Sequence, residues 1–273
     1  MLAWAALAAA GGSAATLAAW ALFESQWVEF AEVELPLPGL PAELDGLRIL
    51  HLSDFHLGKL SLNARAVEKA VAWAEARNAD LVAITGDLVT RRRGEPALER
   101  AVERLSTRCP VFAVLGNHDV AESRDPFVER TDARRSLGAA LLADSSASLE
   151  ARGVRIQVAG VDPAALMQGR ARPEELADPS AALRILLCHF PEIVDRLPPG
   201  AFQLVLAGHT HGGQICIPVP GRKIRLENLG SRYWEGVYNL PNTVLHVSRG
   251  LGTSFVPFRF LSRPEATQLT LRT

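Results

Sequence analysis

The stretch LRILHLSDFH (residues 47–56) begins as an apolar run and ends in polar side chains. The run predicts a buried strand over 47–52, and Asp54 and His56 follow where this strand ends. Apolar residues at helical spacing over 63–78 predict a helix as the next element. The stretch therefore opens an alternation of strand and helix that is typical of an α/β fold.

The alternation continues along the first half of the chain. Apolar runs predict strands over 80–85 and 110–115, and the spacing of apolar residues predicts a helix over 96–107. This order is typical of a largely parallel sheet. The second half is richer in strands, with a hairpin expected over 147–161 and strands over 183–189, 202–209, 243–250 and 266–273. We expect the last two strands to complete a second sheet, and 162–182 and 218–242 to be irregular.

Composition restricts the classes of function. The chain has 273 residues, a formal net charge of −1 and 48% hydrophobic residues, so it can bury a large core. It has no basic excess, which excludes nucleic acid as an expected partner. Cys109, Cys188 and Cys216 are widely spaced, so we expect buried free thiols and neither a disulfide framework nor a cysteine zinc site.

The first 23 residues carry no charged side chain before Glu24. As a helix they would be roughly 34 Å long at about 1.5 Å per residue, enough to cross a bilayer core of about 30 Å. We expect an uncleaved transmembrane signal anchor over 1–23. The alternatives are a cleaved signal peptide, with Ala19-Trp20-Ala21 as a poor cleavage site, and a buried Ala-rich helix.

Residues 24–46 are expected to be a linker or an edge segment, because 34–46 is rich in Pro and Gly. No Lys or Arg occurs before Arg48, so the positive-inside rule gives no reason to hold this flank in the cytoplasm. We therefore expect a protein of the bacterial cytoplasmic membrane whose catalytic domain lies outside the cytoplasm.

Polar side chains stand at the ends of five predicted strands. Because the carboxyl ends of strands in an α/β sheet converge on one crevice, these side chains can meet in space. Carboxylate, imidazole and amide donors together suit Zn, Mn or Fe. One such residue alone would be an ordinary structural side chain, but their joint placement predicts a metal site. Its candidate ligands are Asp54, His56, Asp87, Asn117, His189, His209 and His211, and His118 is a candidate catalytic residue beside them.

Two further observations refine this prediction. His209 and His211 are two apart, a spacing that sends both side chains to the same side of extended backbone, and neighbouring glycines leave room for an ion. His51 and His246 lie inside predicted strands, so we interpret them as core or supporting residues.

In chain order the polar blocks are DFH (54–56), GD (86–87), GNHD (116–119), CH (188–189) and GHTH (208–211). This order resembles the calcineurin-like metallophosphoesterase superfamily over about residues 47–273. HGGQ (211–214), VSRGLGTSFVPFRF (247–260) and PEATQLTL (264–271) are similar to a bacterial branch with an N-terminal membrane segment. The resemblance implies a two-sheet sandwich flanked by helices, with four α/β/β/α layers.

The resemblance also implies two divalent metal ions. Asp54, His56 and His211 would hold one ion, Asn117, His189 and His209 the other, and Asp87 would bridge them. His118 would face the substrate and stabilise its charge or protonate the leaving group. Asp119 would either orient His118 or cap a turn.

The expected activity is hydrolysis of a phosphodiester or pyrophosphate bond. The anchor favours a lipid-linked substrate, because it would confine the enzyme to the surface where such substrates lie. The resemblance implies a substrate of the phospholipid or UDP-diacylglucosamine type. Alternatives are a phosphomonoesterase or phosphoprotein phosphatase, and a non-catalytic metal-binding scaffold. Candidates for gripping an anionic group are Arg91, Arg92, Arg93 and Arg222, although a solvated basic face explains them equally well.

Overall fold

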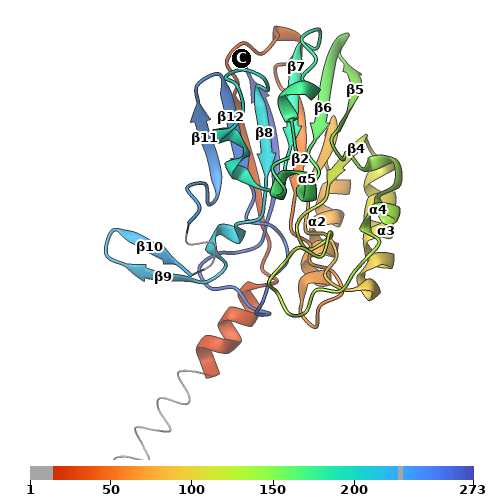
Figure 1. The fold of residues 1–273 in the computed structure, drawn as a ribbon. Coiled ribbons are helices and arrows are strands. Elements are labelled where there is room, and N and C mark those ends of the chain that lie inside the picture. The colour runs from red at the N-terminus through yellow and green to blue at the C-terminus, as the bar shows by residue number, and fades with distance from the viewer. Residues whose placement is uncertain (1–14, 227–229) are drawn as a thin grey trace, which may run out of the picture.

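Two large β-sheets pack face to face. The computed structural model of the protein describes residues 15–226 and 230–273. Within these residues the strands form a five-stranded sheet, a six-stranded sheet and a two-stranded hairpin. Figure 1 shows the two large sheets side by side, with long helices covering the outer face of one of them. This arrangement confirms the expected α/β sandwich flanked by helices.

The first sheet has the strand order β1-β13-β2-β3-β4. Strands β2, β3 and β4 run parallel, as two successive strand–helix–strand units require. β13 pairs parallel with β1 and antiparallel with β2. The bounds are β1 Glu29–Pro36, β2 Arg48–Leu52, β3 Leu81–Thr85, β4 Val111–Val114 and β13 Glu265–Arg272.

The second sheet has the strand order β11-β12-β8-β7-β6-β5. Its strands β6, β7, β8 and β12 are parallel, and the edge strands β5 and β11 are antiparallel to their neighbours. The bounds are β5 Ser145–Ala151, β6 Val154–Gly160, β7 Leu183–Leu187, β8 Leu204–Ala207, β11 Gly236–Leu240 and β12 Thr243–Val247. A separate antiparallel hairpin comprises β9 Cys216–Val219 and β10 Arg222–Arg225.

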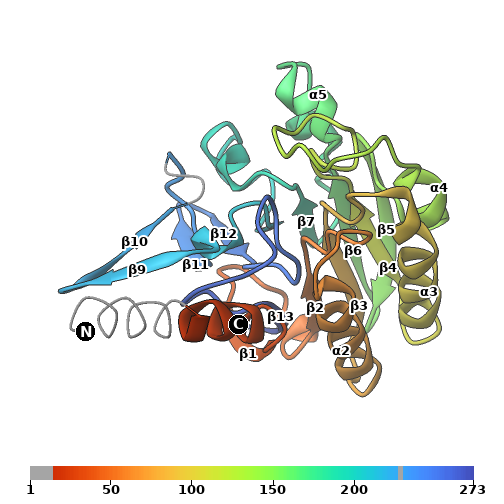
Figure 2. The ribbon, with the colours of Figure 1, turned by 90° about the horizontal axis from the view of Figure 1, so that it is seen from below.

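Helices cover the outer faces of both sheets. Besides a helix over 15–24, the α-helices are α2 Asn63–Glu75, α3 Glu95–Ser106, α4 Ala133–Leu137 and α5 Pro163–Met167. The 3-10 helices are η1 Ala42–Leu44, η2 Arg92–Gly94, η3 Gly138–Ala140, η4 Pro173–Leu176, η5 Pro191–Asp195 and η6 His211–Gly213. Figure 2 shows α2 and α3 beside the first sheet and α5 on the far side of the second.

Alternate residues of each strand enter different cores. Ile49 lies in the core between the sheets, and the next residue, Leu50, lies in the core beneath α2 and α3. Leu186 and Val205 of the second sheet belong to a third core, which includes Ile193 of η5. Burial of one such side chain stabilises the fold by about 1.5–3 kcal/mol. Both sheets are therefore covered on both faces, which fixes their strand ends relative to each other.

Several predicted elements need correction. Residues 266–273 do not complete the second sheet, because β13 lies between β1 and β2 in the first. Of the two alternatives for residues 24–46, a linker or an edge segment, the structure shows the second, because β1 forms the edge of the first sheet. The stretch 218–242 is not irregular throughout, since it contains β10 and β11, and 162–182 contains α5 and η4. Short elements of this kind have too few apolar residues to show a period in the sequence.

The start of the chain is only partly described. Of the expected anchor over 1–23, residues 1–14 lie outside the described residues, and residues 15–24 are helical. Ala21 and Glu24 are buried against the folded domain. Among the described residues, no helix combines the length and apolar character needed to cross a bilayer.

Candidate metal centre

The polar side chains predicted from the sequence gather where strands of both sheets end. Three of these strands, β2, β3 and β4, belong to the first sheet, and β7 and β8 belong to the second. Because the sheets pack face to face, their carboxyl ends form one crevice. After these strands, in the same order, come Asp54 and His56, Asp87, Asn117 and His118, His189, and finally His209 and His211.

The backbone is strained at five of these positions. Positive φ is uncommon for residues other than glycine and costs of order 1–3 kcal/mol at each position. Such a conformation persists only where the surrounding structure enforces it, and it is found preferentially at functional sites. The φ angles are 52° at Asp54, 45° at His56, 53° at Asp87, 73° at His209 and 50° at His211.

Two glycines allow the loops to approach each other. A Cβ atom at Gly116 would overlap the carboxylate of Asp87, and a Cβ atom at Gly208 would overlap the side chains of Ser53 and Asp54. Both positions therefore require glycine, because any larger side chain would collide with the neighbouring loop.

The side chains form three overlapping groups, each with ligand atoms within 4.8 Å of one another. In the first, His211 Nε2 lies 3.6 Å from Asp54 Oδ1 and 3.1 Å from His56 Nε2. In the second, His189 Nε2 lies 3.4 Å from Asp87 Oδ2 and 3.1 Å from His209 Nδ1. The third joins Asp87 with His56 and His118, so Asp87 lies between the other two groups.

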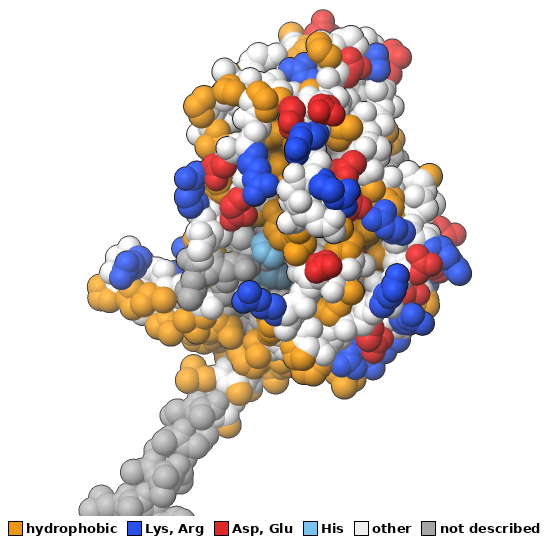
Figure 3. All heavy atoms as spheres, in the orientation of Figure 1, with side chains coloured by type: hydrophobic (Ala, Val, Ile, Leu, Met, Phe, Trp, Pro, Cys, Tyr) orange, Lys and Arg blue, Asp and Glu red, His pale blue; other side chains and the backbone are white. Residues whose placement is uncertain are grey.

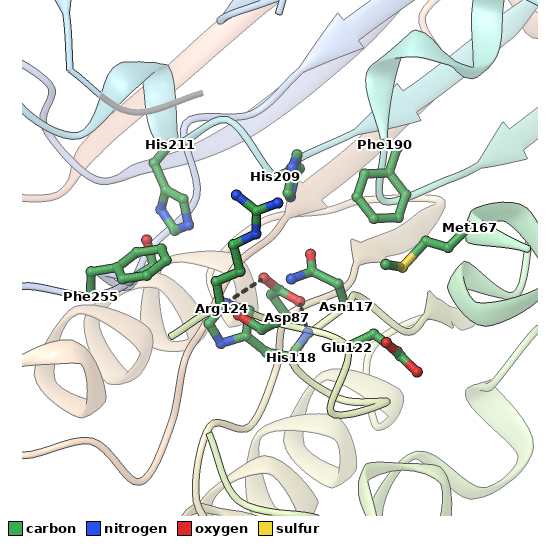
Figure 4. Close-up of a pocket in the computed structure, with 12 residues that line it drawn as sticks. Asp87, Asn117, His118, Glu122, Arg124, Met167, Phe190, His209, His211 and Phe255 are labelled. Atoms are coloured by element: carbon green, nitrogen blue, oxygen red, sulfur yellow. Dashed lines mark hydrogen bonds and ion pairs between the residues drawn. The ribbon is translucent and has the colours of Figure 1, made fainter. Parts of the chain in front are cut away.

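Asn117 joins the second group through its amide oxygen. Asn117 Oδ1 lies 3.1 Å from His189 Nε2. Figure 4 shows Asn117 and Asp87 close together, between His209 and His118. The structure thus brings together all eight of the side chains predicted for the site.

The two buried carboxylates create a demand for positive charge. Burial raises the pKa of Asp54 to about 7, and the charge of Asp87 adds to this effect. Burial also acts to raise the pKa of Asp87, but the neighbouring His189 and His118 outweigh it and hold that pKa well below its usual range. Burial likewise opposes charge on His189, yet Asp87 raises the pKa of this imidazole to about 9. The site therefore favours a cation next to Asp87.

The other imidazoles favour the neutral form, which is the form that binds metals. Burial lowers the pKa of His56 and of His211 well below the usual value. Burial and the neighbouring His189 together lower the pKa of His209 to about 3. Neutral imidazoles beside two buried carboxylates are a donor set that fits a divalent metal ion.

His118 differs from the other histidines in its contacts. Its Nε2 atom lies 2.9 Å from Ser123 Oγ and 3.8 Å from Asp87 Oδ2. Its buried Nδ1 atom has no hydrogen-bond partner within the part of the chain that the structure describes. Burial lowers the pKa of this imidazole, although Asp87 and Asp125 act in the opposite direction.

Asp119 ties two of the site loops together and does not contact the His118 ring. Its carboxylate accepts hydrogen bonds from the backbone N–H groups of Leu88, Val89 and Gly116, at 2.9 Å in each case. Of the two expected roles, the structure therefore supports the one in which Asp119 caps a turn.

A pocket of about 320 Å³ opens above these groups. Sequence reasoning did not single out several of its lining residues: Glu122, Ser123, Arg124, Met167, Phe190, Ser254 and Phe255. Figure 4 shows the guanidinium group of Arg124 extending into the pocket toward His209. Arg124 is five residues after Asp119 in the same loop, and this proximity to the GNHD block is the signal that could have indicated it.

The arginines predicted to grip an anion are not among the residues that line this pocket. Arg91 donates a hydrogen bond to the carbonyl of Phe127, and Arg92 donates one to the carbonyl of Arg130. Arg93 bonds the carbonyl of Gly58. Arg222 lies on β10, in the hairpin that projects from the sheets. Adjacency to a strand end in the sequence did not bring Arg91–Arg93 into the site, because their side chains bond neighbouring loops.

His51 and His246 form a buried pair behind the site. Their Nδ1 atoms are 2.8 Å apart, and His51 Nε2 lies 2.9 Å from the hydroxyl of Thr85. The backbone oxygen of the same Thr85 contacts His189. This placement agrees with the supporting role expected for both histidines.

Comparison with known proteins identifies the family. The sequence model of the calcineurin-like phosphoesterase family matches residues 47–213, more than half of the chain. The metallophosphoesterase YkoQ of Bacillus subtilis is 28% identical to this chain over 84% of each protein. Phosphodiesterase YaeI of Escherichia coli is 26% identical over 82% of each protein.

A third relative carries a more specific name. The UDP-2,3-diacylglucosamine pyrophosphatase LpxG of Chlamydia muridarum is 26% identical, over 89% of this chain and 88% of LpxG. The matched region of the family model contains all the side chains of the candidate metal centre. This chain therefore belongs to the calcineurin-like phosphoesterase family and is a metal-dependent phosphoric ester hydrolase.

Proposed function

We propose that this protein is a membrane-anchored, two-metal phosphoesterase that cleaves a phosphodiester or pyrophosphate bond in a lipid-linked substrate. One observation carries the two-metal proposal: Asp87 lies between two groups of donors, one with Asp54 and His211 and one with His189 and His209. Oδ2 of Asp87 faces both groups, because it lies 3.6 Å from His56 Nε2 and 3.4 Å from His189 Nε2. A carboxylate oxygen has two lone pairs, so this one atom can serve both ions.

In this proposal Asp54, His56 and His211 hold one divalent ion, and Asn117, His189 and His209 hold the other. The ions are Mn, Zn or Fe, because the donors mix imidazole nitrogen with carboxylate and amide oxygen. Bound metal lowers the pKa of a water molecule toward neutrality and offsets the charge of the phosphoryl oxygens.

The remaining tasks fall to side chains of the pocket. His118 reaches it beside Asp87 and meets the phosphoryl group or its leaving oxygen. Arg124 supplies a positive charge that extends into the same space. A guanidinium is suited to this task because it can make two parallel hydrogen bonds to phosphoryl oxygens.

The lipid-linked substrate is supported by three observations. The sequence over 1–23 is uncharged, and membrane attachment would confine the enzyme to the surface where such substrates lie. The pocket has apolar side chains at its edge, including Met167, Phe190 and Phe255. A relative similar over most of the chain is named for a pyrophosphatase that acts on a diacylglucosamine nucleotide. We place the domain outside the cytoplasm, because no Lys or Arg precedes Arg48.

Metal analysis tests the centre. We expect two ions per chain in the wild-type protein and a marked loss of metal in Asp87→Ala, because both donor groups share this carboxylate. Glu122→Ala is a matched control, since Glu122 is an exposed carboxylate at the pocket edge outside the three donor groups. Retention of two ions in Asp87→Ala would refute the bridging role.

A hydrolysis screen tests the substrate class. Full-length protein is incubated with phosphodiesters, phosphomonoesters and lipid-linked pyrophosphates, with Mn, Zn or Fe added in turn. We expect fastest turnover on a lipid-linked diester or pyrophosphate. Preference for a monoester would replace the proposal with a phosphomonoesterase, and no turnover on any ester would favour a binding scaffold.

A further inference from the structure

Exposed hydrophobic side chains gather at the end of the molecule that carries the metal centre. They come from the helix over 15–24, from the loop after β2 and from the β9–β10 hairpin. Figure 3 shows them as a nearly continuous apolar strip along the lower edge, with the histidines of the pocket above it. We call this surface the apolar underside, and it comprises Trp20, Leu22, Phe23, Leu60, Ile217, Ile224 and Leu226.

Hydrogen bonds join the parts of this surface into one unit. The backbone N–H of Arg259 donates to the carbonyl of Ala21 in the N-terminal helix, at 3.2 Å. The N–H of Cys216 in β9 donates to the carbonyl of Phe260, at 2.8 Å. The segment 259–260 is thus hydrogen-bonded both to the N-terminal helix and to the β9–β10 hairpin. Leu22, Leu60 and Pro257 line a common groove beside it.

The hairpin has one polar and one apolar face. Ile217 is paired directly with Ile224, so both side chains lie on the same face. On the other face Lys223 donates to the carbonyl of Leu261, and Arg225 forms an ion pair of 3.1 Å with Glu235. The polar face is therefore attached to the rest of the protein, while the apolar face is turned to the outside. Ile217 is 45% exposed and Ile224 is 39% exposed.

We propose that the apolar underside is a membrane-docking surface, on which the Ile217/Ile224 face of the hairpin enters the interfacial layer of a lipid bilayer. The inference rests on the membrane association proposed above and specifies how the folded domain meets the bilayer. A contiguous apolar surface of this kind marks an interaction site in a soluble domain.

Three observations favour a bilayer over a protein partner. The uncharged sequence over 1–23 ends on this surface. Trp20, Phe23 and Trp27 pack against one another there, with ring centroids 5.5–6.1 Å apart. The guanidinium of Arg263 lies 4.0 Å from the ring of Trp27. Aromatic rings next to basic groups at the end of an uncharged stretch are typical of a membrane interface.

Docking would place the pocket at the membrane surface. Phe255 lines the pocket and Pro257, two residues later, lines the groove of the apolar underside. A phosphoester headgroup could therefore enter the pocket while its acyl chains remain in the bilayer. The hairpin would act as a support that sets the height of the pocket above the lipid.

Depth-dependent fluorescence tests the proposal on the full-length protein. The chain, in a Cys109→Ser background, is reconstituted into vesicles of phosphatidylethanolamine and phosphatidylglycerol. An environment-sensitive NBD fluorophore is attached at Ile224→Cys, while Cys188 and Cys216 remain buried. The matched control label is at Glu150→Cys, an exposed position of β5 near the β5–β6 turn. This turn lies at the end of the second sheet that is away from the apolar underside. Lipids that carry a nitroxide on the acyl chain serve as quenchers.

We expect the label at position 224 to emit at shorter wavelength and to lose most of its emission to the nitroxide lipid, and the label at position 150 to do neither. Water-like, unquenched emission at position 224 on membrane-bound protein overturns docking but leaves the anchor in place. A blue-shifted label that the lipid nitroxide does not quench shows that protein, such as a second copy of this chain, covers the hairpin. Protein that stays off the vesicles overturns both docking and the anchor.

A charged variant separates docking from catalysis. Ile217→Asp/Ile224→Asp should hydrolyse a soluble aryl phosphodiester at the wild-type rate, because neither residue lines the pocket. A label at Leu226→Cys in this variant should lose its lipid quenching, since two carboxylates resist entry into the interface. Unchanged quenching overturns the proposal, and lack of activity on the soluble ester in the wild-type protein points instead to a failure of the proposed function.

Discussion

The Nδ1 atom of His189 lies 2.8 Å from the backbone carbonyl oxygen of Thr85. A carbonyl can only accept a hydrogen bond, so Nδ1 carries the proton and donates it. Nε2 is thereby turned toward Asp87 and Asn117. Such a contact from the nitrogen that does not face the metal sets the tautomer and orientation of a ligand. The carbonyl of Thr85, at the end of β3 in the first sheet, thus orients the imidazole of His189, which follows β7 of the second sheet.

The charge on His189 predicts how metal affinity depends on pH. Asp87 raises the pKa of this imidazole to about 9 from a usual value of 6.5, against the opposing effect of burial. A metal ion needs the deprotonated Nε2 atom, so protons and metal compete for it. We expect the apparent affinity for the divalent ion to increase as pH rises from 6.5 toward 9, measured by competition with a chelator. An affinity that is constant over this range would show that His189 is not a ligand.

Arg124 is expected to bind the phosphoryl group. Loss of one hydrogen bond to a charged group costs about 1.5–3 kcal/mol, so Arg124→Gln should raise KM by roughly 10- to 100-fold. Arg92→Gln is the matched control, because Arg92 donates to the carbonyl of Arg130 outside the pocket. Steady-state kinetics on one substrate suffice for both variants. Equal KM values for Arg124→Gln and the wild-type protein would remove Arg124 from the binding site.

The residues of the metal centre could be predicted from the sequence, whereas most of the residues that surround it could not. Its residues follow strands with strong apolar runs, and the carboxyl ends of such strands converge in any α/β sheet. Arg124 and Phe255 lie on loops, and the path of a loop is set by tertiary contacts. Arg91 illustrates this limit, since it follows a strand end in sequence but bonds the carbonyl of Phe127 instead of lining the pocket.

The assignment of strands to sheets had a similar limit. The sequence over 266–273 predicts a strand, and β13 confirms it, but its position next to β2 depends on pairs such as Leu269 with Ile49. Apolar residues on both faces of β13 are consistent with the middle of either sheet. Tertiary contacts decide between the two sheets. Leu269 packs in the core between the sheets, and Ala266 packs in the core beneath α2 and α3, which places β13 in the first sheet.

Asp119 is expected to contribute to stability. Its carboxylate accepts three backbone N–H groups from two loops, and leaving one buried donor unsatisfied costs about 1–3 kcal/mol. Asp119→Ala should therefore lower the free energy of unfolding by at least about 2 kcal/mol. Asp119→Asn keeps one acceptor oxygen and should lose less. Denaturant unfolding of both variants measures the difference, and equal stability of Asp119→Ala and the wild-type protein would contradict the capping role.

His118 should act in the chemical step and not in metal binding. A general acid or electrostatic stabiliser contributes about 10²–10⁴-fold in rate, so His118→Ala should lose activity by that order while keeping its metal. The alternative is that His118 binds a metal ion, because it lies in a group with His56 and Asp87 that could hold one. Metal content is measured beside turnover, with His56→Ala as the matched variant that should lose both.

The leaving group then distinguishes the two roles open to His118. An ester with a poor leaving group needs a proton in the transition state, whereas an activated aryl diester departs as a stable phenolate. If His118 donates the proton, His118→Ala should slow the poor ester far more than the activated one. If both esters slow equally with metal retained, His118 stabilises phosphoryl charge and is not the proton donor. Loss of metal in step with activity would instead make His118 a ligand, through the group that it shares with Asp87.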